Sequence, residues 1–248
     1  MIAIAYTSPL LESIVRELAN ELALPIVSLE NKSYPLLLVL TETHLELRDL
    51  TDTKLNPIWI DFLSSKLTYR QKHGGGRGQM IARAVGVKPK TTLRVLDLTA
   101  GMGEDAFVLA ALGCHVTMIE RHPIMAALLR DGLRRLHATT ELPLQLIQTS
   151  SAHYLKNLAT DEMPDVIYLD PMFPESGKTA LRKKEMRVLR KLVGDDADAH
   201  ELLALALTQA KKRVVVKRPR RASALNHRQP QIVFSGKSNR FDVYLSHI

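Results

Sequence analysis

The order of apolar runs in the second part of the chain limits the folds that it can adopt. From residue 93 onward, short apolar runs alternate with segments of helical periodicity, which is typical of βαβ units and of a parallel sheet covered on both faces. The last two runs follow each other with no room for a helix, so we expect them to pair as an antiparallel hairpin. The predicted strands are residues 93–98, 115–120, 144–149, 166–170, 213–217, 231–235 and 241–246.

Helical patterns fill the gaps between the first five of these strands. The predicted helices run from Glu104 to Leu112, from Pro123 to His137 and from Ser151 to Ala159. A longer insert from Lys178 to Ala210 is expected to hold two helices around Val193-Gly194-Asp195. Seven strands with a terminal hairpin resemble the sheet of Rossmann-like methyltransferases. The predicted fold class is therefore α/β, with this mostly parallel sheet forming a domain at residues 91–248.

Residues 1–90 have a different pattern and are predicted to form a small α+β lobe. It comprises the strand-like run IAIAY, a helix from Pro9 to Leu22, two apolar runs around Thr41-Glu42-Thr43, and the segment IWIDF. The lobe ends in the loop KHGGGRG at residues 72–78, whose glycines let the backbone approach another group closely. A flexible linker is the alternative for that loop.

Composition narrows the class of protein. With 46% apolar and 24% charged residues, the chain has ordinary globular composition. The single cysteine, Cys114, excludes an internal disulfide and fits a reducing compartment. The N-terminus lacks a basic segment before an apolar core, and the run LLLVL is too short to span a bilayer. We expect a cytoplasmic protein with no membrane partner and no metal.

The net charge of +8 is concentrated in RKKEMRVLRK at residues 182–191 and KKRVVVKRPRR at residues 211–221. Such clusters favour a polyanion such as nucleic acid, and a solvated basic face is the alternative.

The segment LDLTAGMGEDA at residues 96–106 places a glycine-rich loop between a strand and a helix. Gly101 and Gly103 match a dinucleotide fingerprint that alone fits both NAD and S-adenosylmethionine (SAM). Asp97, Glu104 and Asp105 flank the loop, and each would repel a pyrophosphate by about 4 kcal/mol at about 4 Å. The same acids attract the sulfonium and ammonium groups of SAM, which is the predicted cofactor. Stabilisation of the helix dipole is the alternative role for Glu104 and Asp105.

Further candidate cofactor residues follow the next two strands. Ligands of doubly wound sheets bind beyond the carboxyl ends of the strands. Glu120, with Arg121 beside it, is predicted to bind the ribose hydroxyls of the cofactor, and Ser150 or Ser151 to bind its adenine end or to cap the next helix.

The stretch Asp170-Pro171-Met172-Phe173 ends the fourth strand at the same edge. It resembles the D/N-P-P-Y/F motif of methyltransferases that modify exocyclic amines of bases, with Met in place of the second Pro. The Asp170 carboxylate and a carbonyl of Pro171 or Met172 would accept the two amine hydrogens, and Phe173 would stack on the base, a contact worth about 1–3 kcal/mol. The predicted catalytic residues are Asp170, Pro171 and Phe173; a plain surface turn is the alternative.

Six segments in this order and spacing are similar to one family, the bacterial 16S ribosomal RNA guanine-N2 methyltransferases known as RsmJ: KHGGGRG, DLTAGMGEDAFVLA, ERHP, YLDPMFP, KKEMR and KRVVVKRP. The resemblance runs from about residue 36 to the C-terminus. It implies SAM-dependent methylation of one guanine N2 in small-subunit ribosomal RNA, with cofactor contacts at Glu104, Asp105, Glu120, Arg121, Ser150, Ser151 and Asp170.

The basic segments gain a role from this resemblance, because basic side chains at helical spacing can follow a phosphate backbone. The implied partner is 16S ribosomal RNA or the small ribosomal subunit, and the oligomeric state stays open. The predicted RNA contacts are Lys72, Arg77, Lys183, Lys184, Arg187, Lys217, Arg218 and Arg220.

Other functions share parts of this pattern. A DNA or RNA adenine-N6 methyltransferase would use the same pocket, and a non-catalytic RNA-binding protein would share the fold. A nicotinamide-dependent oxidoreductase shares the glycine loop and is opposed by the acids around it.

Overall fold

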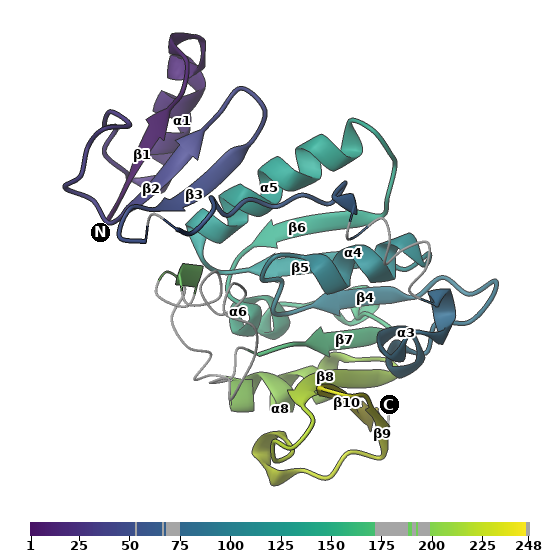
Figure 1. Ribbon diagram of the computed structural model, residues 1–248. Coiled ribbons are helices and arrows are strands. Elements are labelled where there is room, and N and C mark those ends of the chain that lie inside the picture. Colours follow the sequence, from purple (N-terminus) through teal and green to yellow (C-terminus); the bar gives the residue numbers. More distant parts are fainter. Residues whose placement is uncertain are drawn as a thin grey trace. The chain divides into compact units, whose positions relative to one another are not determined.

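Two units make up the computed structural model, shown in Figure 1. The structure describes residues 1–52, 54–65, 67, 75–171, 188–189, 192 and 199–246. Unit 1 comprises Met1–Asp61, His122–Arg135 and Pro174–Asp195, and unit 2 comprises Phe62–Arg121, Leu136–Phe173 and Asp196–Ile248. A separate domain at residues 1–90 stays a prediction, and each unit is described by itself.

Unit 2 contains a seven-stranded sheet of order β6-β5-β4-β7-β8-β10-β9. The first five of these strands in spatial order are parallel, and β10 pairs antiparallel with both β8 and β9. The predicted terminal hairpin and its antiparallel strand are therefore confirmed. The strands are β4 (Arg94–Asp97), β5 (His115–Glu120), β6 (Leu144–Gln148), β7 (Val166–Leu169), β8 (Arg213–Pro219), β9 (Ile232–Ser235) and β10 (Asn239–Leu245).

Local sequence explains where the helices of unit 2 begin and end. The helix α4 (Glu104–Ala111) starts after Gly103, whose φ of 72° suits glycine. The helix α6 (Ser151–Lys156) is capped by the Ser150 hydroxyl, which accepts the His153 N–H at 3.2 Å. The helix α3 (Met80–Val85) ends at Gly86, with φ 85°. The remaining elements are α8 (Ala199–Gln209) and the 3-10 turns η2 (Gly76–Gly78), η3 (Thr160–Glu162) and η4 (Leu225–His227).

The two faces of the sheet in unit 2 carry different side chains. Alternate residues such as Leu96, Ile167 and Val214 pack in one buried cluster with Leu155 of α6 and Leu203 of α8. Because successive strand residues point to opposite faces, the side chains between them face the other layer. Asp97, Tyr168 and Lys217 belong to that second set.

Unit 1 contains a three-stranded sheet of order β1-β2-β3, in which β1 pairs parallel with β2, and β2 pairs antiparallel with β3. Ala3, Ala5, Leu37 and Val39 form the core on one face of this sheet. The elements are β1 (Ile2–Tyr6), the 3-10 turn η1 (Pro9–Leu11), α1 (Glu12–Leu22), β2 (Leu36–Leu40) and β3 (Leu45–Asp49), and Pro123–His137 form α5, nearly all of it in this unit.

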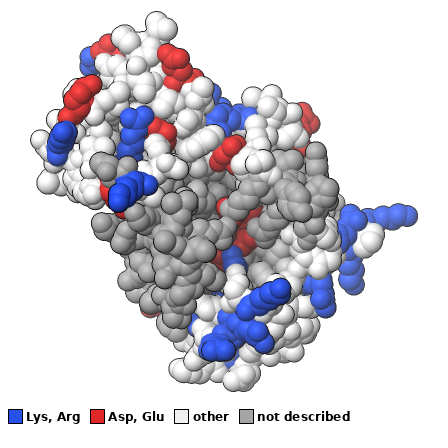
Figure 2. All heavy atoms as spheres, in the orientation of Figure 1, with Lys and Arg blue, Asp and Glu red and all other residues white. Residues whose placement is uncertain are grey.

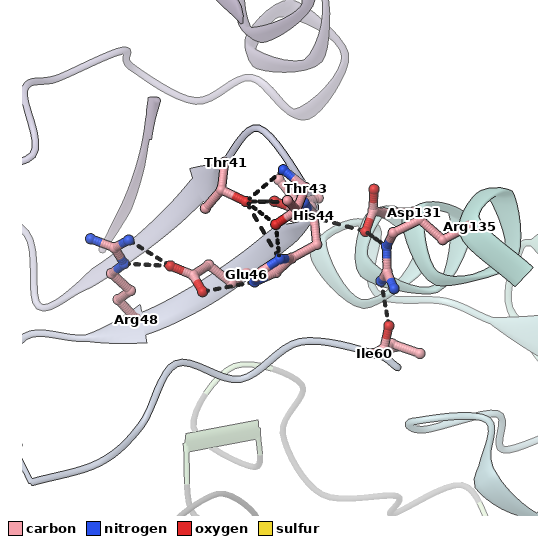
Figure 3. A network of polar contacts seen from close by, with 9 residues as sticks. Thr41, Thr43, His44, Glu46, Arg48, Ile60, Asp131 and Arg135 are labelled. Carbon is pink, nitrogen blue, oxygen red and sulfur yellow. Dashed lines mark hydrogen bonds and ion pairs between the residues drawn. The ribbon is translucent and has the colours of Figure 1, made fainter. Parts of the chain in front are cut away.

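A polar network joins β3 to α5 (Figure 3). The buried Asp131 of α5 accepts the backbone N–H of Leu45 at 3.1 Å and the Arg135 Nε–H at 2.9 Å. Arg135 also donates to the carbonyl of Ile60 and lies 5.1 Å from the ring centre of Trp59. Asp131 and Arg135 together therefore link α5 to β3 and to the segment around Ile60.

The neighbouring end of this network contains another buried acid, Glu46. Its Oε2 lies 3.0 Å from His44 Nε2, and its Oε1 accepts the Arg48 Nε–H at 2.7 Å. His44 stacks on Trp59 with ring centres 4.1 Å apart. Glu46 is thus compensated within unit 1, as a buried carboxylate requires.

The predicted elements compare closely with the observed ones. All seven strands are confirmed to within two residues, and α5 has the predicted limits. The helix α6 ends before the predicted Ala159, and α3 was not predicted. In the insert, α8 lies within the predicted range, whereas the segment around Val193-Gly194-Asp195 lies outside the described residues.

Among the described residues, no helix combines the length and apolarity that a membrane crossing would require.

Replacing Asp131 by Ala is expected to lower the free energy of unfolding by about 3 kcal/mol, because the Leu45 N–H and the Arg135 guanidinium lose a buried acceptor. Urea unfolding of the purified variant measures this loss. Glu12→Ala, which removes an exposed ion pair with Arg16, is the matched control and should leave the midpoint unchanged. Equal midpoints for Asp131→Ala and the wild type would contradict the structural role of the network.

Candidate functional site

The candidate site lies in unit 2, where β4 and β7 end and β8 continues alongside. The paired residues Asp97 and Tyr168 on β4 and β7, and Leu169 and Val216 on β7 and β8, fix the strand register. Continued by one or two residues, this register brings Thr99, Asp170 and Lys217 together. The Asp170 N–H donates to Thr99 Oγ1 at 2.6 Å, in agreement with that alignment.

The glycine-rich loop connects the end of β4 to α4 at this edge. Gly101 and Gly103 have φ angles of 53° and 72°, a region that side chains other than glycine rarely adopt. The Gly103 N–H donates to the Ala100 carbonyl at 2.8 Å, which closes the turn. The predicted loop is confirmed as a tight strand-to-helix connection.

Lys217 joins two acids of the site. Its Nζ lies 2.8 Å from Asp105 Oδ2 and 2.7 Å from Asp170 Oδ2. The Tyr168 hydroxyl donates to the same Asp105 oxygen at 2.8 Å. Burial lowers the pKa of Lys217, but attraction to Asp170 and Asp105 outweighs this and holds the pKa above its usual value. The ammonium group is therefore charged and compensates carboxylates from α4 and from the end of β7.

Asp97 is the most deeply buried acid of the site, with 2% of its surface exposed. Its Oδ1 accepts the Thr99 N–H at 3.0 Å. Burial, together with the nearby charges of Asp105 and Asp170, raises the pKa of Asp97 to about 7, although the Thr99 hydrogen bond lowers it. A nearby cation would favour the ionised form, so the charge of Asp97 is coupled to what binds at this edge.

The remaining candidate cofactor residues follow the next strands of the same edge. Glu120, the last residue of β5, is buried, and its carbonyl accepts the Thr149 N–H at 3.0 Å. Arg121 is exposed. Ser151 Oγ donates to the Leu98 carbonyl at 2.6 Å, which ties α6 to the start of the glycine loop. Ser150 caps α6, so capping, its predicted alternative role, is confirmed.

The predicted RNA contacts differ in their surroundings. Arg77 and Arg220 are exposed, and Figure 2 shows Lys and Arg side chains gathered near the loop after β8. Arg218 is buried, and its guanidinium donates twice to the Ser223 carbonyl, so its charge serves an internal contact. Lys217 belongs to the acid cluster. The predicted contacts Lys72, Lys183, Lys184 and Arg187 lie outside the described residues, as do the catalytic candidate Phe173 and its neighbour Met172.

Three features of the site were missed from the sequence: the Thr99 hydroxyl, the Tyr168 hydroxyl and the ion pairs of Lys217. A signal was present, because Tyr168 and Asp170 are two residues apart, as are Val215 and Lys217, so each pair shares one face of the sheet. The strand register needed to align the pairs was not available from the sequence.

The charged and hydrogen-bonding groups at this edge fit SAM. The carboxylates of Asp97, Asp105 and Asp170 suit a positively charged sulfonium or ammonium group, and Glu120 supplies acceptors of the kind that ribose hydroxyls use. Gly101 of the glycine loop is exposed. These residues would hold the cofactor by charge and hydrogen bonding.

Comparison with known proteins agrees with this chemistry. A family model described as "Putative SAM-dependent methyltransferase" matches residues 17–246. A solved SAM-dependent methyltransferase from Neisseria gonorrhoeae is 32% identical, with a TM-score of 0.75 and coverage of 100% of this chain and 96% of that one.

Curated relatives carry a more specific name. "Ribosomal RNA small subunit methyltransferase J" from Coxiella burnetii (strain RSA 331 / Henzerling II) is 51% identical over 98% of this chain and 96% of its own length. The protein of the same name from Tolumonas auensis is 53% identical over 85% of this chain and 86% of its own length. That from Pseudoalteromonas atlantica is 50% identical, over 87% of each chain.

Asp97→Asn is expected to change how stability depends on pH. The folded-state pKa of Asp97, about 7, lies above its ordinary value of 3.8. Between these two pH values the folded wild type therefore holds a proton that the unfolded chain has lost. Its stability relative to the variant should fall by up to about 1.4 kcal/mol per pH unit as pH rises from 5 toward 7, then level off. Urea unfolding at several pH values, without ligand, measures the difference; a pH-independent difference would contradict it.

Proposed function

This chain belongs to the ribosomal RNA small subunit methyltransferase J family, and from that premise we propose that it transfers a methyl group from SAM to the exocyclic N2 of one guanine in 16S ribosomal RNA. The observation that carries the proposal is the position of Asp170, which directly follows β7. Its carboxylate pairs with Lys217, and the same ammonium group also pairs with Asp105 at the start of α4, directly after the glycine loop. An acid there can accept an amine N–H next to a bound cofactor.

The chemistry requires such an acceptor. The lone pair of a guanine N2 amine is delocalised into the ring, so the nitrogen is a poor nucleophile. If the Asp170 carboxylate accepts one N–H and the Pro171 carbonyl the other, the lone pair is directed out of the plane. SAM, when bound, supplies the electrophilic methyl group. Positioning is then the main catalytic contribution, and Asp170 or water takes the proton that the alkylated amine releases.

Access to the base requires RNA binding. A base inside a helix has to be flipped out before its amine reaches a pocket, and unpaired bases are the usual targets of sequence-specific RNA recognition. We propose that Arg77 and Arg220, both exposed, contact phosphates, and that Phe173 stacks on the base. The partner is 16S ribosomal RNA or the small subunit in the cytoplasm, where the single cysteine stays reduced.

Two other functions use the same groups. An adenine-N6 methyltransferase would need the same acceptors for its amine, and a non-catalytic RNA-binding protein would keep the fold and the basic residues. The methylated nucleoside, or its absence, distinguishes them from the proposed function.

The direct test offers the protein methyl-labelled SAM with small-subunit ribosomal RNA, with and without ribosomal proteins, and then analyses the nucleosides. Label is expected in N2-methylguanosine. Asp170→Asn should lower kcat roughly 100-fold to 1000-fold, because a charged acceptor in the transition state is lost.

Asp165→Asn is the matched control for that substitution, since Asp165 precedes β7 at its opposite end and pairs with Lys212. It should keep wild-type kcat. Label in N6-methyladenosine would support the adenine alternative, and SAM binding without any labelled product would refute guanine methylation on these substrates.

RNA binding is expected to depend on salt through the exposed arginines. Each phosphate contact in single-stranded RNA contributes about 0.7 to the slope of log K against log salt concentration, so the double substitution Arg77→Gln and Arg220→Gln should reduce the slope by about 1.4. Fluorescence anisotropy with a labelled RNA measures it. Lys54→Gln in unit 1 should leave the slope unchanged; an unchanged slope in the double variant would argue against both contacts.

A further inference from the structure

Lys217 occupies a place that its sequence context does not reveal. It lies in a basic run, KKRVVVKRPRR, yet its side chain is only 22% exposed, and its ammonium contacts two carboxylates within 2.8 Å. These carboxylates come from different elements, Asp105 from the first turn of α4 and Asp170 from the end of β7. The ammonium group of Lys217 is therefore already paired with carboxylates, which makes it a poor candidate for a phosphate contact.

The charged groups that face Lys217 explain why a cation is needed there. Asp97 comes from β4, Asp105 from α4, and Tyr168 and Asp170 from β7 and its end. Three acids so close together repel one another, and each tends to take up a proton unless a cation balances it. An acid that carries a proton on the required oxygen no longer accepts an amine N–H.

We infer that Lys217 is a positioning residue for methyl transfer, which keeps the Asp170 carboxylate ionised and oriented by holding its Oδ2 against Asp105. This inference rests on the proposed function for its effect on catalysis. A carboxylate offers about four lone-pair sites, so the ion pair is compatible with an additional hydrogen bond from the substrate amine. Lys217 acts through Asp170 and differs from the phosphate contacts Arg77 and Arg220.

Removal of the cation has two consequences. The Asp170 carboxylate loses its fixed orientation, which lowers kcat because productive geometry is lost. The acids also take up protons at higher pH, since an opposite charge within about 4–6 Å shifts their titration by about 1–3 pH units. If Lys217 served only to bind RNA, its removal would instead raise the KM for RNA and lower the salt dependence of binding.

The experiment compares Lys217→Met, Lys217→Arg and Lys212→Met at saturating SAM, with kcat, the KM for RNA and the pH profile of kcat measured for each. Lys212 is the matched control because it lies just before β8 and also pairs with an acid, Asp165, at 2.8 Å. Lys217→Met is expected to lower kcat about 10-fold to 100-fold and to move the acidic limb of kcat upward by at least about 1 pH unit. Lys217→Arg should restore the limb, and Lys212→Met should match the wild type in both.

Two results would overturn the inference. A raised KM with unchanged kcat would make Lys217 a phosphate contact, and a lowered kcat with an unmoved acidic limb would make it a packing residue. NMR titration of carboxyl-labelled aspartates gives a readout that does not need catalysis: Asp170 should titrate at higher pH in Lys217→Met than in the wild type. If the wild type transfers no methyl group, the proposed function fails, and the NMR titration still decides whether Lys217 controls Asp170.

Discussion

The ion pairs of Lys217 are the interaction on which the candidate site depends. Three carboxylates meet at the carboxyl edge of the sheet in unit 2, and a partly buried cation, Lys217, balances their charge before any ligand binds. The cation comes from β8, the acids from β4, α4 and the end of β7. Strand order and register, rather than any local motif, therefore create the electrostatics of the site.

Much of the fold follows from the sequence because its signals are local and repeated. Apolar runs of strand length, a proline at the first position of α5 and a serine before α6 each mark one element by short-range chemistry. The direct succession of the last two runs also predicted the antiparallel β10. The six-residue α3 gave no comparable signal, since so short a helix is stabilised mainly by tertiary packing.

The site was predictable in part for the same reason. Residues at the ends of parallel strands converge on one edge, so strand order predicted that Asp97, Glu120 and Asp170 lie together there. The glycine loop and the stretch that begins at Asp170 identified two of these acids as candidates. Arg218 and Lys217 show where this reasoning stops. Both look like surface cations in the sequence, yet one binds the Ser223 carbonyl and the other binds two acids, because alternation along β8 and its register with β7 decide which cations turn inward.

The distribution of charge separates attraction for RNA from the chemistry of the site. Residues 1–61 contain four basic and nine acidic residues and so carry a net charge of −5. Because the whole chain has a net charge of +8, residues 62–248 carry +13. Long-range attraction for a polyanion therefore arises from the part of the chain that also forms the candidate site. Inside the site the sign is reversed, since the carboxylates favour a cationic cofactor. Lys217 belongs to both patterns: it lies in a basic run of the sequence, and its ammonium group helps to keep the carboxylates of the site ionised.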